Sequence, residues 1–197
     1  MIENCTAVIM AGGDSRRMGQ DKANLQLGGR TLLQSVFATL QPLFPEVIVS
    51  VRQPRPEIDL PQVCDDPAYS GPLAGLAAAL AQASSPWIFV VACDMPFITP
   101  AVIEYLALQR VDCQAVVPMV GGYPQPMAAF YATGCLKVVQ DILDSNGKHS
   151  MLAPLEMLKV CYVSEAQMLS VDPQLRSFFD LDTPQDVARA MKQGEAQ

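Results

Sequence analysis

The sequence predicts a single α/β domain built on a doubly wound, mostly parallel β-sheet with an antiparallel addition. Strand-like and helix-like segments alternate along the chain, which is typical of parallel sheets covered by helices. The first three strand-like segments are near-continuous apolar runs, as expected for strands buried on both faces. With 197 residues, half of them apolar, the chain can bury a substantial core. We therefore expect one domain over residues 1–197, with 193–197 as a frayed tail.

The predicted strands are short and rich in Val, Ile, Phe and Ala. They are expected at Thr6–Ala11, Val47–Val51, Trp87–Cys93, Gln114–Met119 and Met127–Tyr131, with a further short strand at Val160–Val163. Gly121-Gly122 separates the fourth and fifth of these segments, and paired glycines favour the tight turn of a hairpin. This hairpin accounts for the antiparallel addition to the sheet.

The predicted helices follow most of the strands. They are expected at Thr31–Leu40, Pro72–Ala83, Pro100–Leu108, Leu136–Asp144, Met151–Leu158 and Pro184–Lys192. Two of these starts, Thr99-Pro100 and Thr183-Pro184, place a capping threonine before a proline at the first helical position. In folds of this class ligands bind at the carboxyl ends of the strands, so functional residues are expected in the loops that follow them.

Composition argues against several classes of partner. The net charge is −7, with a pI near 4.6, so long-range attraction to nucleic acid is not expected. An anionic ligand would need cations gathered locally. No apolar run is long enough to span a bilayer, and the N-terminus lacks the basic and apolar regions of a secretion signal. We therefore expect a cytoplasmic protein without a membrane partner.

The six cysteines and the single histidine argue against zinc and against histidine-dependent nucleophilic catalysis. No two cysteines are closer than twenty positions, and none forms a C-x-x-C pair. Ser-His-Asp or Cys-His chemistry would have to use His149, which lies in a polar turn after Gly147-Lys148. Most of the cysteines are expected to be small buried apolar residues in a reducing compartment.

The loop after the first strand carries a concentration of glycines and cations. It contains Gly12, Gly13, Ser15, Arg16, Arg17 and Lys22. Adjacent glycines let the backbone approach a ligand closely, while hydroxyl and cationic side chains suit phosphate oxygens. The spacing matches neither the G-x-x-x-x-G-K-[ST] loop nor the G-x-G-x-x-G fingerprint. The alternative to a phosphate site is an ordinary turn with solvated cations.

A single carboxylate follows the third apolar strand. Asp94, in Cys93-Asp94-Met95-Pro96, is delivered to the same edge of the sheet as the opening loop. Mg²⁺ is typically held by one or two carboxylates, with substrate phosphates and water completing its coordination. Asp94 is therefore the predicted metal ligand. The alternative, a cap for the next helix, suits Thr99 better.

Residues 10–22, MAGGDSRRMGQDK, closely match the pattern L-A-G-G-x-S-x-R-M-G-x-D-K of the molybdenum cofactor guanylyltransferases. The chain resembles this family over nearly its whole length: further matches are GPLAG at 71–75, CDMP at 93–96, QP at 125–126 and DTPQD at 182–186. The resemblance implies the Rossmann-like nucleotidyltransferase fold.

The resemblance also implies roles for individual residues. The nucleotide would be approached by the backbone at Met10, Ala11, Gly12 and Gly13, with Ser15 beside it. Arg17 and Lys22 would contact the phosphates, and Asp66 would help to recognise the nucleoside. Asp94 would bind Mg²⁺ and contact the nucleotide. A carboxylate can accept from both N–H groups on the edge of guanine, which suits this role for Asp66. Asp66 also precedes Pro67, so its alternative role is to form a turn.

Two positions depart from the family pattern. Ser50 stands where many relatives carry asparagine, so its contact to the nucleotide would pass through water. Asp180-Leu181-Asp182 stands where the family shows N-x-N, and the i, i+2 spacing places both carboxylates on one face of an extended segment. Asp182 is thus a second candidate metal ligand, with capping of the next helix as the alternative. Asp180 is either a companion ligand or a solvated charge.

The function implied by the resemblance is transfer of GMP from GTP to the terminal phosphate of molybdenum-molybdopterin, with Mg²⁺ as cofactor. Transient contacts with molybdoenzymes or their maturation factors are expected. Two alternatives stay open: a cytidylyltransferase acting on the same acceptor, and a non-catalytic nucleotide-binding adaptor. Relatives with cytidylyl activity tend to read A-A-G where this chain has Ala11-Gly12-Gly13, which favours guanine.

Overall fold

The computed structural model describes residues 1–12, 24–145, 147, 149–181 and 186. Its main sheet has the order β10-β7-β9-β6-β1-β4-β5, with β8 paired to β7. The strands are β1 (Cys5–Met10), β4 (Glu46–Val51), β5 (Gln62–Cys64), β6 (Trp87–Ala92), β7 (Ala115–Val120), β8 (Tyr123–Pro124), β9 (Ala128–Ala132) and β10 (Val160–Val163). A separate two-stranded hairpin joins β2 (Gln26–Leu27) to β3 (Arg30–Thr31).

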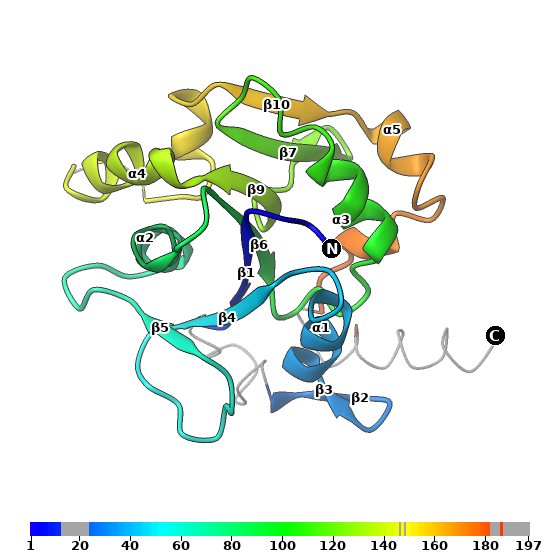
Figure 1. Cartoon of the computed structure of the whole chain (residues 1–197), viewed down its shortest axis with the longest axis horizontal. Helices are drawn as coiled ribbons and strands as arrows, with labels where there is room; N and C mark the ends of the chain where they lie inside the picture. Colours follow the sequence, from blue (N-terminus) through cyan, green and yellow to red (C-terminus); the bar gives the residue numbers. More distant parts are fainter. Residues whose placement is uncertain (13–23, 146, 148, 182–185, 187–197) are drawn as a thin grey trace.

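Helices cover both faces of the main sheet, as Figure 1 shows. They are α1 (Leu32–Leu40), α2 (Pro72–Gln82), α3 (Pro100–Ala107), α4 (Leu136–Leu143) and α5 (Glu165–Leu169), with 3₁₀ turns at Thr133–Cys135, Ala153–Glu156 and Arg176–Phe178. One apolar cluster packs α1 and α3 against the sheet, and a second packs α2 and α4 against the opposite face. Along β1, Val8 and Met10 belong to the second cluster and Ile9 to the first. This alternation confirms a sheet buried on both sides.

The sheet is mostly parallel, as predicted. β1 pairs in parallel with β4 and β6, β4 with β5, and β7 with β10. β9 is antiparallel to both β6 and β7. The predicted hairpin is present between β7 and β8, where Gly121 (φ 60°) and Gly122 (φ 79°) occupy the left-handed region that a two-residue turn requires. The predicted antiparallel addition is therefore confirmed.

One predicted helix is wrong, and several short elements were not predicted. The segment Met151–Leu158 forms only the 3₁₀ turn Ala153–Glu156, because Pro154 lacks a backbone N–H and disfavours α geometry in the residue before it. The unpredicted elements are the hairpin strands β2 and β3, the strand β5 and the helix α5. Each contains too few residues to show a periodic pattern. The helix expected at Pro184–Lys192 lies, except for residue 186, outside the described residues.

No helix in the described part of the chain has the length and apolar character needed to cross a membrane.

Candidate functional site

Predicted site residues meet at the carboxyl ends of β1, β4 and β6. Three backbone hydrogen bonds extend the strand pairing beyond the strand ends: Ala11 N–H to Ser50 O (2.8 Å), Cys93 N–H to Met10 O (3.1 Å) and Asp65 N–H to Val51 O (3.1 Å). They hold the first residues of three loops at one edge of the sheet. Gly12, Asp65 and Asp94 are therefore neighbours of this edge although they are far apart in the sequence.

Helix α2 approaches this edge at Gly75. A Cβ atom at this position would lie 2.6 Å from the Cε of Met10, 2.7 Å from the Oγ of Ser50 and 3.4 Å from Oδ1 of Asp65. At Gly12 a Cβ would lie 3.8 Å from Oδ2 of the same Asp65 carboxylate. We call Met10, Gly12, Ser50, Asp65 and Gly75 the edge cradle. Because neither glycine carries a side chain, the backbone of α2 at Gly75 and the chain at Gly12 can pack closely against the Ser50 hydroxyl and the Asp65 carboxylate.

Two polar atoms of the edge cradle are buried and lack a hydrogen bond to the residues that the structure describes. Ser50 and Asp65 are 1% and 8% exposed, and neither Ser50 Oγ nor Asp65 Oδ1 has a hydrogen-bond partner among the described residues. Burial raises the pKa of the Asp65 carboxyl, while the positive charge of Arg52 lowers it. An unsatisfied buried polar group costs about 1–3 kcal/mol. The edge cradle is thus suited to a ligand that donates hydrogen bonds.

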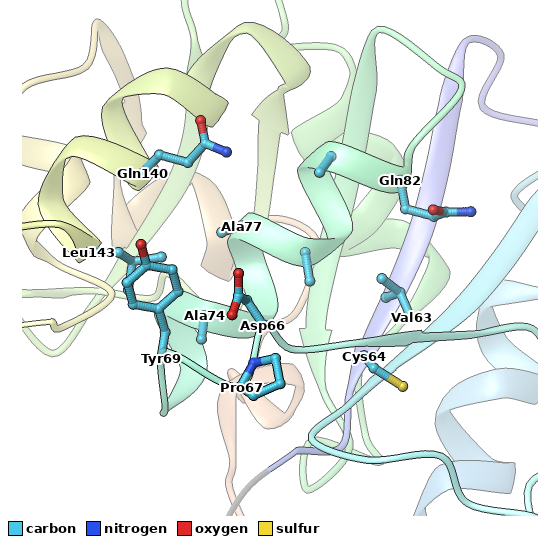
Figure 2. Close-up of a pocket in the computed structure, with 12 residues that line it drawn as sticks. Val63, Cys64, Asp66, Pro67, Tyr69, Ala74, Ala77, Gln82, Gln140 and Leu143 are labelled. Atoms are coloured by element: carbon cyan, nitrogen blue, oxygen red, sulfur yellow. The ribbon is translucent and has the colours of Figure 1, made fainter.

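Asp66 faces a different part of the surface. Its Oδ1 accepts from the Ala68 N–H at 2.9 Å, so the carboxylate forms the turn that the sequence offered as its alternative role. Figure 2 shows the Asp66 carboxylate directed toward Ala77 of α2, in a pocket of about 460 Å³ between β5, α2 and α4. The Tyr69 hydroxyl, also in this pocket, donates to Asp144. The nucleoside role predicted for Asp66 stays a prediction.

The pocket of Figure 2 is poorly suited to a phosphate. Its described lining residues include no lysine or arginine, and four of them are alanines of α2. Asp66 adds a negative charge. The triphosphate of a nucleotide is therefore not expected to bind there.

Asp94 follows β6 and is half-buried at the same edge as the edge cradle. Its backbone carbonyl accepts from the Leu181 N–H at 2.9 Å, which brings the segment containing Asp180 beside it. No group of three or more His, Cys, Asp or Glu side chains within the described residues could hold a metal by itself. A single carboxylate fits Mg²⁺, because this ion commonly takes one or two protein carboxylates and completes its shell with phosphates and water.

Several predicted site residues lie outside the described part of the chain. They are Gly13, Ser15, Arg17, Lys22 and Asp182. Met10, Ala11, Gly12, Ser50 and Asp94 are brought together at the sheet edge.

Comparison with known proteins decides the family. A model of the MobA-like NTP transferase domain matches residues 7–160. The chain belongs to this family. Among curated members, the probable molybdenum cofactor guanylyltransferase of Pelotomaculum thermopropionicum is 37% identical over 192 residues, covering 96% of this chain and 93% of that protein. The molybdenum cofactor guanylyltransferase of Syntrophotalea carbinolica is 35% identical, covering 96% and 91%.

Solved structures agree with this assignment to the MobA-like family. The molybdopterin-guanine dinucleotide biosynthesis protein A of Archaeoglobus fulgidus superposes with a TM-score of 0.86 and 28% identity, covering 98% of this chain and 100% of that one. The 2-C-methyl-D-erythritol 4-phosphate cytidylyltransferase of Thermus thermophilus gives a TM-score of 0.66 at 22% identity, covering 96% and 98%. The second similarity shows the shared fold. The predicted α/β nucleotidyltransferase fold is confirmed.

Asp65 is the member of the edge cradle that the sequence did not single out. It directly follows β5, whose last residue Cys64 is paired with Val51. An Asp-Asp pair was visible in the sequence, but only the position of β5 shows which carboxylate turns inward. A strand assigned to Gln62–Cys64 would have placed Asp65 at the ligand-binding edge.

Proposed function

We propose that this member of the MobA-like family is a magnesium-dependent guanylyltransferase that transfers GMP from GTP to the terminal phosphate of molybdenum-molybdopterin. The observation that carries the proposal is the edge cradle, in which the buried Ser50 Oγ and Asp65 Oδ1 have no hydrogen-bond partner within the described part of the chain. The names of the curated relatives support the acceptor. Their similarity extends over nearly the whole chain.

Guanine suits the edge cradle because it presents two adjacent N–H donors. An ionised carboxylate only accepts hydrogen bonds, and no described residue donates one to Asp65 Oδ1. Guanine N1–H and its 2-amino group can both donate to such a group, whereas cytosine offers a single amino group. We therefore assign base recognition to Asp65. Asp66 is the alternative that the sequence suggests, and Ser50 supplies a hydroxyl beside the nucleoside.

The reaction requires positioning and charge stabilisation. An oxygen of the acceptor phosphate forms a bond to the α-phosphorus of GTP, the bond from that phosphorus to the β-phosphate oxygen breaks, and pyrophosphate leaves with the electron pair. A phosphate nucleophile is already ionised near neutral pH, so no general base is needed from the protein. Aligning the reacting groups and stabilising the developing charge supply the rate enhancement.

The chain's own residues provide this alignment. Gly12 lets the backbone approach the nucleotide at the end of β1, and Asp94 holds its carboxylate at the same sheet edge. When bound, Mg²⁺ neutralises charge on the phosphates, and Asp94 is the residue that would hold it. Arg17 and Lys22, outside the described residues, are assigned to the triphosphate by the sequence.

Calorimetric titration of GTP, CTP, ATP and UTP, each with and without Mg²⁺, tests this proposal. We expect GTP to bind most tightly and Mg²⁺ to strengthen its binding. A preference for CTP would assign the chain to cytidylyl transfer instead. Failure to bind any nucleotide would overturn the nucleotide role of the edge cradle.

A further inference from the structure

The C-terminal part of the described chain runs antiparallel beside the loop that carries Asp94. We call the segments 94–99 and 177–181 together the clasp. Three contacts join them in order: Asp94 with Leu181, Phe97 with Phe179, and Thr99 with Ser177. The residue numbers fall along one segment as they rise along the other. Because the contacts include both ends, the whole loop between β6 and α3 is held from one side.

Ser177 makes the contact at the α3 end of the clasp, and it is fully buried. Its Oγ accepts from the Thr99 N–H at 3.2 Å and donates to Thr99 Oγ1 at 3.3 Å. Thr99 Oγ1 also accepts from the Val102 N–H as the N-cap of α3. Ser177 therefore binds the residue at which α3 begins. Its position relative to the helix is set by two hydrogen bonds.

A buried carboxylate accepts a hydrogen bond from the Ser177 backbone. Asp172 is 7% exposed, and its Oδ2 accepts from the Ser177 N–H at 2.8 Å. Hydrogen bonds to a charged acceptor are stronger than those between neutral groups. Leu175, between these two residues, has φ 51°, in the left-handed region that non-glycine residues rarely adopt. The backbone is thus strained at Leu175, two residues before the serine that contacts Thr99.

Aromatic and apolar contacts hold the middle and the far end of the clasp. The rings of Phe97 and Phe179 lie 6.5 Å apart, and the Arg176 guanidinium lies 5.0 Å from the centre of the Phe97 ring. Leu181 is fully buried in a small cluster with Leu32. These contacts place the Leu181 N–H at the Asp94 carbonyl.

We propose that Ser177 is a positioning residue for Asp94 and acts through the clasp. This inference rests on the proposed function, in which Asp94 holds the divalent cation. The loop 94–99 connects a strand to a helix and contains the predicted ligand at its first residue. A metal ligand must be held within about 0.5 Å of its working position, so neighbouring contacts that lock the loop affect affinity. Removing the Ser177 hydroxyl frees one end of the clasp and lets Asp94 move from that position.

The direct test is binding of Mn²⁺, as a paramagnetic substitute for Mg²⁺, to the protein with GTP. Free Mn²⁺ is followed by electron paramagnetic resonance. We expect Ser177→Ala to weaken Mn²⁺ binding by roughly three- to tenfold, the effect of losing one or two buried hydrogen bonds. The Kd for GTP without metal should stay unchanged. A general loss of structure would weaken both.

Three further variants separate positioning from stability. Ser164→Ala removes the N-cap of α5, where Ser164 Oγ accepts from the Gln167 N–H, and should leave Mn²⁺ affinity at the wild-type value. Thr99→Ser keeps the hydroxyl that Ser177 binds and should bind Mn²⁺ with nearly wild-type affinity. Thr99→Val lacks this hydroxyl and should bind Mn²⁺ more weakly. Phe179 is 41% exposed, so Phe179→Ala should fold and still weaken Mn²⁺ binding. Phe179→Ala therefore tests the clasp even if Ser177→Ala does not fold.

The two proposals fail in different ways. Wild-type protein that binds Mn²⁺ no more tightly with GTP than without it would contradict the proposed metal-dependent function. Wild-type protein that shows GTP-dependent binding, while Ser177→Ala and Phe179→Ala both match it, would overturn the positioning role alone. Equal weakening by Ser164→Ala and Ser177→Ala would also overturn it, because stability would then explain the effect.

Discussion

A Cβ atom on Gly75 would lie 2.6 Å from the Cε of Met10, so helix α2 and strand β1 meet here with no room for a side chain at residue 75. The same Cβ would lie 2.7 Å from the Ser50 hydroxyl. Both obstructing atoms are at the ends of side chains that can rotate. A methyl group at residue 75 can therefore be accommodated, but only by displacing groups of the edge cradle.

Gly75→Ala should weaken GTP binding by about tenfold or more while the protein remains folded. Displacing packed groups typically costs about 1–3 kcal/mol, and an alanine within a helix recovers part of this in stability. Calorimetric titration of GTP measures the loss. Gly134→Ala is the matched control, because a Cβ there would meet nothing within 4 Å. Equal GTP affinity in the two variants would show that displacing the Met10 and Ser50 side chains does not affect nucleotide binding.

Asp65→Asn and Asp66→Asn distinguish the two adjacent carboxylates. We expect Asp65→Asn to weaken GTP binding by about 10- to 100-fold, the value of hydrogen bonds to a charged group, and to abolish the preference over ATP. Asp66→Asn should change GTP affinity little, because one oxygen of Asp66 serves the turn with Ala68. Competition of each nucleotide against a fluorescent GTP analogue measures both. The reverse order of effects would return base recognition to Asp66.

These two aspartates show where sequence-based prediction reached its limit. The parallel strands were predictable because long apolar runs are typical of buried strands. The position of Asp94 at the ligand-binding edge was also predictable, because it directly follows such a strand. β5 was not, since Gln62–Cys64 contains three residues and is a strand only through its pairing with β4. Which of two adjacent carboxylates turns inward depends on that pairing.

The clasp was equally outside the reach of local sequence patterns. Thr99 was predictable as a helix cap, but its contact with Ser177 joins residues 78 positions apart. At Met151–Leu158 the sequence predicted an element that does not form. Its apolar residues suggested an α-helix, but Pro154 limited the segment to a 3₁₀ turn.

The buried Asp65 carboxyl should make stability depend on pH in a defined direction. Burial raises its pKa above the ordinary value of 3.8. A raised pKa favours the protonated folded state, so this contribution to stability is complete below about pH 3.8 and is lost as the pH rises through the folded-state value. Without nucleotide, Asp65→Asn should therefore gain thermal stability relative to wild type as the pH rises from about 4 to about 7. Thermal unfolding across this range measures it; a constant difference would contradict a raised pKa.

Asp94→Asn should remove the effect of Mg²⁺ on GTP binding and leave metal-free binding nearly unchanged. Asparagine keeps the shape of the side chain but loses the charge that holds a hard cation. Turnover should fall by roughly 10²-fold or more, the effect of removing one charge-stabilising group. Titration of GTP with and without Mg²⁺ checks the first expectation. A variant whose GTP binding still tightens with Mg²⁺ would assign the metal to another ligand.

Pyrophosphate release from GTP in the presence of molybdenum-molybdopterin and Mg²⁺ tests the central claim most directly. We predict release that depends on the acceptor, forms molybdopterin guanine dinucleotide in equal amount, and is much slower with CTP. Release with CTP but not with GTP, or no release with either nucleotide despite tight GTP binding, would contradict guanylyl transfer by this chain.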